Sequence, residues 1–420
     1  MLTVDEAIAA VLRRASVLPA RSVRLADALG LTLAVDVRAD IDLPPFDKAL
    51  MDGYAVRSAD LGDPGEYRLR VVDDITAGRD PGRALGPGES ARIMTGPPLP
   101  PGADAVVMVE QTRAPGDGTV VVPGGVRSGQ NRLPRGREMR EGELLLRGGT
   151  RIDAAKLGLI ASAGLADVPV IPAPCVAVVP TGDELVPVAD RPGPGQIRNT
   201  NAVMLGGLAR ALGAGPVFES AIAPDEPSGL RDLLRAALIG PRDAGSGTNP
   251  TGLDRGRTDV LLVSGGVSAG TRDLVPSALI DLEIEPVFHK VHVKPGKPLW
   301  FGVGPRRGGR PGALVFGLPG NPASGLVGFL LFVRPAIDAM AGRTPARADR
   351  MAGRLGAPFA HRGDRPTYHP ARLEGGRIIP LDWAGSADLR TVALADGFAA
   401  FPGGDHSYLE GDEVPFLPIG

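Results

Sequence analysis

The chain has 420 residues, of which 43% are hydrophobic and 22% are charged, and its formal net charge at pH 7 is −2. This length allows roughly two to four domains with their own cores, and the near-neutral charge without a basic stripe argues against a nucleic-acid binder. The single cysteine, Cys175, excludes an intramolecular disulfide framework and a cysteine-based zinc site. Its apolar neighbours indicate a buried thiol in a strand rather than a nucleophile. The sequence opens without a signal peptide, and its longest apolar stretch, near Leu326–Val333, is too short to span a bilayer, so it predicts a soluble cytoplasmic protein.

The N-terminal segment predicts two helices and a strand. Thr3-Val4-Asp5-Glu6 is a capping box that opens the first helix. A second, short helix is expected over Leu25–Leu29, where Gly30 ends it. The alternating segment Leu31–Val37 predicts a strand.

A loop rich in apolar and aromatic residues follows at Leu43–Val56. Two prolines and an Asp-Gly step predict the loop, while Phe46, Met51 and Tyr54 indicate that it packs against another surface. It either packs on its own domain or forms a site wall that offers Asp52.

The segment from Glu66 to Val122 predicts a compact β-rich module inserted between helical flanks. Its strands are separated by Gly/Pro turns and are expected over Tyr67–Val72, Ser90–Met94, Ala105–Glu110 and Thr119–Val122. Thr95 follows the second of them. The polar and basic segment 129–138 is either a solvated loop or a ligand contact.

From Cys175 strands and helices alternate, which predicts an α/β sheet with helices on its faces. The segment Gly240–Arg257 is predicted to be a mobile surface loop. The expected strands are Cys175–Val179, Pro216–Ala221, Asp259–Val263, Ile284–Val293 and Ala313–Phe316, and the expected helices are Ala202–Leu212 with an Asn201 cap, Leu230–Leu238, and a third from Asp273.

Polar groups follow several of these strands. Thr181-Gly182-Asp183-Glu184, Asp225-Glu226 and Ser264-Gly265-Gly266 come at strand ends, where α/β sheets bind ligands. The loop from Ser264 to Ser268 resembles an anion-binding loop, because glycines allow a close backbone approach and a helix start carries partial positive charge. A tight strand-to-helix turn without a ligand is the alternative.

Two further turns add candidate anion contacts. The stiff Lys-Pro-Gly-Lys-Pro loop contains or adjoins Lys290, Lys294 and Lys297. Binding a phosphate therefore costs these lysines less conformational entropy than it would cost lysines in a flexible loop. Pro319-Gly320-Asn321-Pro322 ends a strand and starts a helix with an Asn cap and Pro at the first position. From about Ala341 the chain predicts a small β domain, with strands over Thr367–Leu373, Arg377–Leu381, Gly397–Phe401 and Asp412–Leu417 and with Ser386 between them.

Taken together, six motifs in register resemble the molybdopterin molybdenumtransferase family, which is related to the gephyrin E domain and to the plant molybdenum-insertase domain. They cover essentially the whole chain and are PPFDxxxMDGYAV, RIMTGPPLPPGADAVV, TGDEL, SGGVSxGxxD, KPGKP and GLPGNPxS. The resemblance implies a three-layer α/β molybdopterin-binding domain with an inserted β-rich module and a small C-terminal β domain. The implied boundaries are an extended linking domain (1–40 and 145–172), the inserted module (41–144), the molybdopterin-binding domain (173–340) and the C-terminal domain (341–420).

The resemblance also implies an activity and a set of site residues. Family members insert molybdate into adenylated molybdopterin with hydrolysis of the adenylate and release of AMP, as homodimers with the site between subunits. Glu184, Asp225 and Asp273 are the implied Mg²⁺ ligands and, with Asp52, Lys290 and Lys294, the implied catalytic residues. The implied substrate-binding residues are Thr95, Glu138, Thr181, Gly182, Ser264, Gly265, Gly266, Ser268, Lys297, Pro319, Asn321, Pro322 and Ser386.

Three departures from the family pattern leave alternatives open. Lys48 replaces a usual Asn, Glu138 a usual Asp, and Arg198-Asn199 a usual Tyr-Asp. A non-catalytic molybdopterin-binding scaffold and a paralogue with shifted preference for tungstate are therefore alternatives. A nucleotidyl-transfer enzyme is a third, which the inserted module and the C-terminal domain disfavour.

Overall fold

The computed structural model describes residues 1–239, 258–267, 274–306, 311–345 and 351–420. The chain divides into two compact units. The first consists of Met1–Val35, Gly148–Leu157 and Asp167–Gly420, and the second of Asp36–Arg147 and Gly158–Ala166. The boundary falls inside helix α2 (Ala154–Ser162).

The second unit is built around a five-stranded sheet, as its β-rich sequence predicts. The strand order is β8-β5-β7-β6-β9, with β5 (Gly53–Val56), β6 (Glu66–Ile75), β7 (Glu89–Ile93), β8 (Ala105–Met108) and β9 (Thr119–Pro123). Alternate residues of these strands enter different cores. Val107 and Val120 pack in one hydrophobic cluster, and Val106 and Ile93 in another. The predicted strands are confirmed to within a few residues.

Short elements complete this unit. Strand β4 pairs with β10, and β3 pairs with β11. Their bounds are β3 (Val37–Arg38), β4 (Lys48–Ala49), β10 (Arg132–Leu133) and β11 (Leu144–Leu146), and the 3₁₀ turns are η2 (Ser58–Asp60) and η3 (Val109–Gln111).

The predicted strand Leu31–Val37 is wrong as a single element. The chain bends at Ala34–Val35 and leaves two short strands, β2 (Thr32–Leu33) and β3. Strand β2 joins β12 (Asp167–Ile171) in the first unit, whereas β3 joins β11 in the second. The break therefore follows from the pairing of the two halves with different partners.

The first unit contains a six-stranded sheet in the order β16-β13-β17-β20-β19-β18. The first four strands are parallel, and the last two pairings, β20 with β19 and β19 with β18, are antiparallel. The bounds are β13 (Val176–Pro180), β16 (Val217–Glu219), β17 (Val260–Ser264), β18 (Glu285–His289), β19 (Trp300–Val303) and β20 (Leu314–Leu318). The predicted α/β sheet is confirmed.

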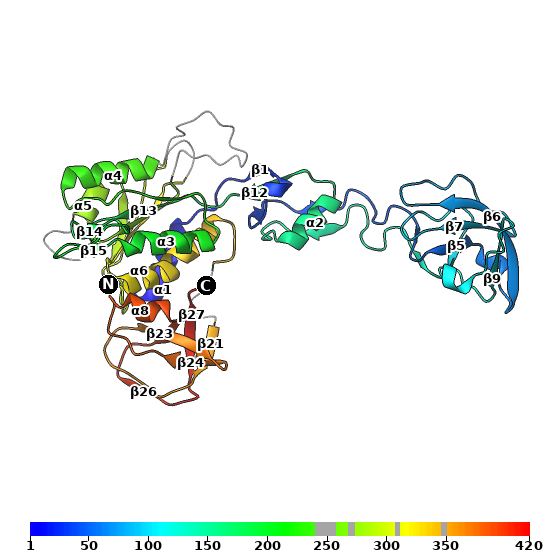
Figure 1. Ribbon diagram of the computed structural model, residues 1–420. Helices are drawn as coiled ribbons and strands as arrows, with labels where there is room; N and C mark the ends of the chain where they lie inside the picture. Colours follow the sequence, from blue (N-terminus) through cyan, green and yellow to red (C-terminus); the bar gives the residue numbers. More distant parts are fainter. Residues whose placement is uncertain (240–257, 268–273, 307–310, 346–350) are drawn as a thin grey trace. The chain divides into compact units, whose positions relative to one another are not determined.

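Helices cover both faces of this sheet, because its central strands are apolar on both sides. Val178, Leu262 and Phe316 belong to one hydrophobic cluster with residues of α1, α3 and the α6–α7 run, and Val179 and Val263 belong to another with residues of α4 and α5. Figure 1 shows α4 and α5 on one side of β13 and α3 and α6 on the other. The bounds are α1 (Val4–Arg14), α3 (Thr200–Ala211), α4 (Pro227–Ile239), α5 (Val275–Asp281), α6 (Pro322–Gly328), the π-helical turn η4 (Phe329–Val333) and α7 (Arg334–Met340).

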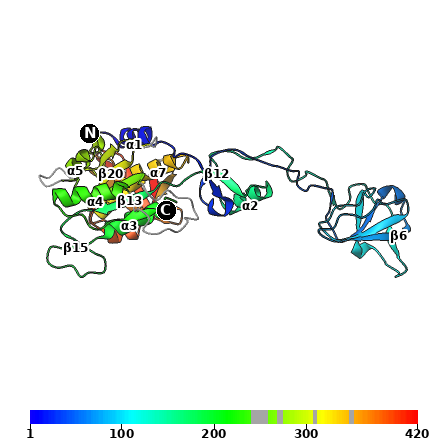
Figure 2. The ribbon, with the colours of Figure 1, turned by 90° about the horizontal axis from the view of Figure 1, so that it is seen from above.

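The continuous helical run Pro322–Met340 is the apolar centre of this unit. It has 19 residues and is long and apolar enough for a membrane span by length and composition, but 89% of its most apolar window is buried inside the protein. Figure 2 shows α1 lying beside α7. The run therefore acts as a core helix in this fold.

Two local expectations need correction. Helix α3 is capped by Asn199, whose side chain accepts a hydrogen bond from the Ala202 N–H at 3.2 Å, so Asn201 is not its cap. The predicted strand Ile284–Val293 ends at His289, because Lys290 adopts a left-handed conformation with φ 75° and turns the chain. Cys175 is a buried free thiol, as expected, and directly precedes β13.

The C-terminal region of the first unit is a small β domain, as predicted. A closed barrel is formed by β21 (Met351–Leu355), β24 (Arg377–Pro380), β23 (Thr367–Glu374), β25 (Gly397–Phe401) and β27 (Glu413–Pro418). Its core contains Ile378, Phe401 and Phe416. The remaining elements of the unit are β1 (Arg21–Arg24), η1 (Leu25–Asp27), β14 (Leu185–Val186), β15 (Ile197–Arg198), β22 (Phe359–His361), β26 (His406–Tyr408) and α8 (Leu389–Ala393).

Candidate functional site

Several polar loops of the first unit meet at one edge of its sheet. The parallel strands β13, β17 and β20 end at Pro180, Ser264 and Leu318, which are register partners across the sheet. Strand β19 runs the opposite way, so the loop that precedes it at Trp300 lies at the same edge. The topology therefore brings the Thr181, Ser264, Lys297 and Pro319 loops together, as the sequence predicts for strand ends.

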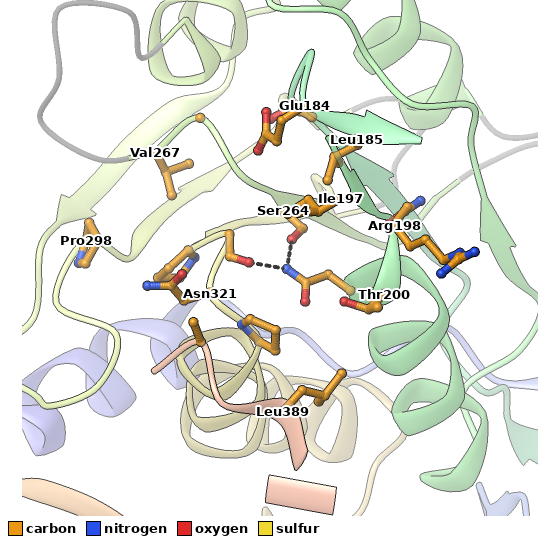
Figure 3. Close-up of a pocket in the computed structure, with 18 residues that line it drawn as sticks. Glu184, Leu185, Ile197, Arg198, Thr200, Ser264, Val267, Pro298, Asn321 and Leu389 are labelled. Carbon is orange, nitrogen blue, oxygen red and sulfur yellow. Dashed lines mark hydrogen bonds between the residues drawn. The ribbon is translucent and has the colours of Figure 1, made fainter. Parts of the chain in front are cut away.

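A pocket of about 620 Å³ opens at this edge. Figure 3 shows Glu184 and Leu389 on opposite walls, with Arg198 and Pro298 at the two sides. Seven of the predicted site residues line it: Thr181, Glu184, Ser264, Gly266, Pro319, Asn321 and Pro322.

The predicted anion loop is a tight turn that requires its two glycines. Gly265 and Gly266 have φ of 104° and 63°, where L-residues are strained. A Cβ on Gly265 would lie 2.5 Å from the Thr181 carbonyl oxygen, and one on Gly266 would lie 2.7 Å from a methyl group of Val275. The Gly265 N–H already donates to the Leu318 carbonyl at 3.0 Å, so this donor serves the turn rather than a ligand.

The Thr181–Glu184 loop also depends on a glycine. Gly182 has a φ of 139°, and a Cβ there would collide with the carboxylate of Glu184. Glu184 therefore folds back over Gly182 while it lines the pocket. The neighbouring loop is tied to this one because the Asp225 N–H donates to Asp183 Oδ1 at 3.1 Å. Two of the three predicted Mg²⁺ ligands, Glu184 and Asp225, thus lie on joined loops.

Asn201 is a site residue that the sequence reasoning missed. Its Nδ2 donates to Ser264 Oγ at 2.9 Å and to the Gly320 carbonyl at 2.7 Å (Figure 3). It therefore fastens the end of β17 to the loop after β20. No sequence pattern signals this bridge, because its partners lie 63 and 119 residues away.

The C-terminal β domain contributes one wall. Asn321 Nδ2 donates to Ser386 Oγ at 2.9 Å, and the Ala323 N–H donates to the Ser386 carbonyl at 3.1 Å. Asn321 precedes α6 as predicted, but its side chain makes no capping hydrogen bond. The first turn of α6 is therefore joined to Ser386, and two of the predicted substrate-binding residues, Asn321 and Ser386, are neighbours.

The three predicted lysines lie near this edge but do not line the pocket. Pro298, next to Lys297, does line it. Lys294 is exposed, and its backbone joins the C-terminal barrel, since its N–H donates to Pro366 and its carbonyl accepts from Tyr368, both at 2.8 Å.

In the second unit, Asp52 and Thr95 contact each other directly. Asp52 Oδ1 accepts from the Thr95 N–H at 2.6 Å and from its hydroxyl at 2.7 Å. Both hydrogen bonds hold the pKa of Asp52 below its ordinary value, and the bond from the Thr95 hydroxyl has the larger effect. Glu138 is exposed, and its N–H donates to the Leu43 carbonyl.

Two predicted residues, Ser268 and Asp273, lie outside the described residues, as does the loop Gly240–Arg257. Within the described ranges, no group of three or more His, Cys, Asp or Glu side chains is placed to hold a metal ion. The predicted Mg²⁺ set includes Asp273, so it stays a prediction.

Several pocket residues were not predicted as site residues. Arg198 and Asn199 were noted only as departures from a family pattern, and Leu389 belongs to the C-terminal domain. Arg198 Nε donates to the carbonyls of Val188 and Asp190 at 3.0 and 3.1 Å, which fixes a positive charge at the rim. The unpredicted lining residues are Leu185, Ile197, Arg198, Asn199, Thr200, Asn201, Val267, Pro298, Gly320, Ala387 and Leu389.

Three family models match consecutive parts of the chain. The MoeA N-terminal region (domain I and II) matches residues 2–164, a probable molybdopterin binding domain matches 248–339, and the MoeA C-terminal region (domain IV) matches 352–419. The pocket therefore combines residues of the second and third matched regions with residues between 181 and 201, which lie between the first and second regions.

Curated relatives match over nearly the whole chain. The molybdopterin molybdenumtransferase of Staphylococcus aureus (strain Mu50) is 31% identical over 99% of this chain and 95% of its own length. That of Bacillus subtilis (strain 168) is 32% identical over 100% and 94%. The crystal structure of the molybdopterin biosynthesis MoeA protein from Pyrococcus horikoshii has a TM-score of 0.82 and 30% identity, covering 100% of this chain and 99% of that one. The chain belongs to the MoeA family, whose curated members carry the name molybdopterin molybdenumtransferase.

Proposed function

We propose that this protein is a molybdopterin molybdotransferase of molybdenum cofactor biosynthesis, which inserts molybdate into adenylated molybdopterin and releases AMP. The observation that carries the proposal is the pocket at the strand ends, in a chain that molybdopterin molybdenumtransferases match from end to end. A pocket with polar loops at this edge is where α/β sheets bind small ligands.

The residues present suit an anionic, planar substrate. Arg198 supplies positive charge at the pocket, and Lys290, Lys294 and Lys297 lie in the segments that follow β18 and precede β19. Proline and aliphatic side chains form flat apolar walls for a ring system, including Ile197, Pro298 and Pro319. We assign molybdate, a tetrahedral oxyanion, to the loops of Lys297, Asn321 and Ser386.

We assign a divalent cation to the acidic loops. Mg²⁺ prefers carboxylate oxygens, which Glu184 and Asp225 offer on two joined loops, with Asp273 as the third candidate ligand. When bound, such a cation shields the charge of the phosphoanhydride that is to be cleaved. The protein holds Glu184 in place through the glycine turn at Gly182.

The proposal also covers assembly and location. We assign Asp52, Thr95 and Glu138 to the site that a partner subunit of a homodimer contributes, as the family resemblance implies. A cytoplasmic location also belongs to the proposal, and a shifted preference for tungstate stays its alternative.

The test is turnover. Purified protein given adenylated molybdopterin, molybdate and Mg²⁺ is expected to release AMP and form the molybdenum cofactor. Glu184→Gln and Asp273→Asn are expected to slow AMP release severely, because each removes a carboxylate from the predicted cation site. Glu285→Gln is the matched control, since Glu285 begins β18 at the opposite edge of the sheet and is exposed. Absence of AMP release from the wild-type protein would reject the transferase.

The departures that suggested a scaffold protein do not favour one in the structure. Asn199 replaces a usual carboxylate but still caps α3, and Arg198 replaces a usual aromatic residue but lines the pocket. Binding of molybdopterin without AMP release, together with a protein partner, is the result that would favour the scaffold over the enzyme.

A further inference from the structure

The loop over residues 381–388, here called the wall loop, connects β24 to α8 and brings the C-terminal domain to the pocket. Ser386 in this loop is joined to Asn321 at the start of α6. Ala387 in the loop and Leu389 at the start of α8 line the pocket (Figure 3). The position of the wall loop therefore determines where Ser386 and this wall of the pocket lie.

The imidazole of His369 holds the beginning of the wall loop. His369 lies in β23, and its Nε2 lies 2.8 Å from the Leu381 carbonyl oxygen. Because a carbonyl oxygen only accepts, Nε2 carries the proton and donates it. The Leu381 N–H donates to the Pro370 carbonyl at 3.0 Å. The barrel strand thus binds both backbone groups of Leu381, and the bond from His369 fixes the peptide plane that leads into the rest of the loop.

Aromatic packing adds a second contact between His369 and the wall loop. The rings of His369 and Trp383 are perpendicular, with centroids 5.5 Å apart and an interplanar angle of 89°. Phe359 packs against the same imidazole with centroids 4.7 Å apart. One side chain of the barrel therefore contacts the loop at two residues, Leu381 and Trp383.

The ring of His369 is neutral at pH 7. Burial lowers the pKa of His369 from its ordinary value, and the charges of Lys294 and His361 lower it further, against the opposite effects of the Leu381 bond and of Asp382. A buried polar ring destabilises a protein unless it is hydrogen-bonded. Since the bond from Nε2 goes to the wall loop, the ring stabilises the fold only when the loop is in place.

We propose that His369 is a positioning residue, which holds the wall loop so that Ser386 meets Asn321 at the pocket. This inference rests on the proposed function, in which Ser386 and Asn321 contact molybdate. His369 does not line the pocket, so it acts through the loop. The loss of its N–H is therefore expected to change the position of Ser386 without removing any group that contacts the substrate.

The test compares two substitutions of His369 in the full chain. His369→Phe keeps an aromatic ring against Trp383 but removes the N–H. His369→Gln loses the ring but places an amide N–H near the position of Nε2, so it can donate to the Leu381 carbonyl. His406→Phe is the control for the same substitution, because His406 is exposed in β26 and its Nε2 faces the Gly403 carbonyl at 3.3 Å rather than the wall loop.

Tryptophan fluorescence reports the position of the wall loop without any substrate. The chain has two tryptophans, of which Trp300 is 2% exposed and Trp383 is half-buried in the loop. His369→Phe is expected to shift the emission to longer wavelength, because a displaced loop exposes Trp383 to water. His369→Gln and His406→Phe are expected to keep the wild-type emission maximum. Adding Trp383→Phe to His369→Phe should remove the shift, which assigns it to this tryptophan.

Steady-state AMP release at varied molybdate concentration measures the effect on the proposed reaction. His369→Phe is expected to raise the KM for molybdate roughly tenfold, as for the loss of one hydrogen bond, and to keep kcat near the wild-type value. Such a split indicates weaker binding with unchanged chemistry. His369→Gln should restore the wild-type KM. A merely structural role would lower the melting temperature and leave the KM of the folded protein unchanged.

The remaining outcomes overturn the inference in distinguishable ways. A wild-type emission maximum in His369→Phe would show that the N–H does not hold the loop. Equal defects in His369→Phe and His369→Gln would show that this N–H is not what positions the loop. A shifted emission with a wild-type KM would show that the loop moves without consequence for molybdate. If the wild-type protein released no AMP, the proposed function would fail, and the emission spectra alone would decide whether His369 holds the wall loop.

Discussion

At the scale of single residues, the site depends on glycines that allow loops to approach each other. Gly265 combines a φ of 104° with a position where a Cβ would lie 2.5 Å from the Thr181 carbonyl oxygen. Gly207, in α3, is exposed and has open space where its Cβ would be. The same substitution is therefore expected to have opposite effects at the two positions.

Gly265→Ala is predicted to lower the free energy of unfolding by about 2 kcal/mol or more, from backbone strain and the close contact. Gly207→Ala is predicted to raise it by roughly 0.5 to 1 kcal/mol, because alanine favours a helix over glycine. Urea denaturation of both variants measures the difference. A Gly265→Ala protein as stable as the wild type would contradict the turn geometry described for this loop.

At the residue scale, some site residues could be predicted from the sequence and others could not. The motif residues Thr181, Glu184, Ser264 and Asn321 were identified from strand ends and a helix start, and they do line one pocket. Asn201 was interpreted as a helix cap because an Asn near a helix start commonly caps it. Its real partners lie in loops after two other strands, and only the folded sheet brings them together.

At the scale of elements, the N-terminus of α3 forms part of the pocket rim. Asn199 caps the helix by accepting from the Ala202 N–H, and it also lines the pocket. A negative charge at the start of a helix stabilises the helix, whereas the same charge repels an anionic substrate in the pocket. A change of charge at this position is therefore expected to affect stability and binding in opposite directions.

Asn199→Asp is predicted to raise the free energy of unfolding by about 0.3 to 1 kcal/mol through the helix dipole, and to weaken binding of adenylated molybdopterin. Asn199→Ala is predicted to lower the free energy of unfolding by about 1 kcal/mol through loss of the cap. Thermal unfolding and ligand titration at two salt concentrations test both. In titrations without Mg²⁺, the binding effect of Asn199→Asp should shrink at high salt, since it is electrostatic, and tighter binding under these conditions would contradict the proposed anionic ligand.

Element types were easier to predict than pairings. Apolar runs such as 259–263 and 313–316 predicted β17 and β20, because strands buried on both faces are continuously hydrophobic. The short strands β14 and β15 were missed, since two-residue strands carry no periodicity. The antiparallel strand β19 was also missed, although it places the Lys297 loop at the edge of the site.

At the scale of the whole molecule, the predicted site residues are divided between the two compact units. Glu184 and Asp225 belong to the first unit, and Asp52 and Thr95 belong to the second. Motif order along the chain cannot tell whether one subunit or two supply a complete site. The proposed function assigns the second unit's residues to a partner subunit, and mixing inactive variants tests that assignment.

Glu184→Gln and Asp52→Asn are each predicted to be inactive as homodimers. After subunit exchange, a mixed dimer would have one site with both defects and one site with neither, if each site joins the first unit of one subunit to the second unit of its partner. Since half of randomly mixed dimers are of this kind, AMP release should recover to about a quarter of the wild-type rate. Mixing Glu184→Gln with Asp225→Asn is the control and should recover nothing, because both defects lie in the first unit. Sites contained within single subunits would give no recovery in either mixture, which would contradict the shared site while leaving the transferase activity of the wild type intact.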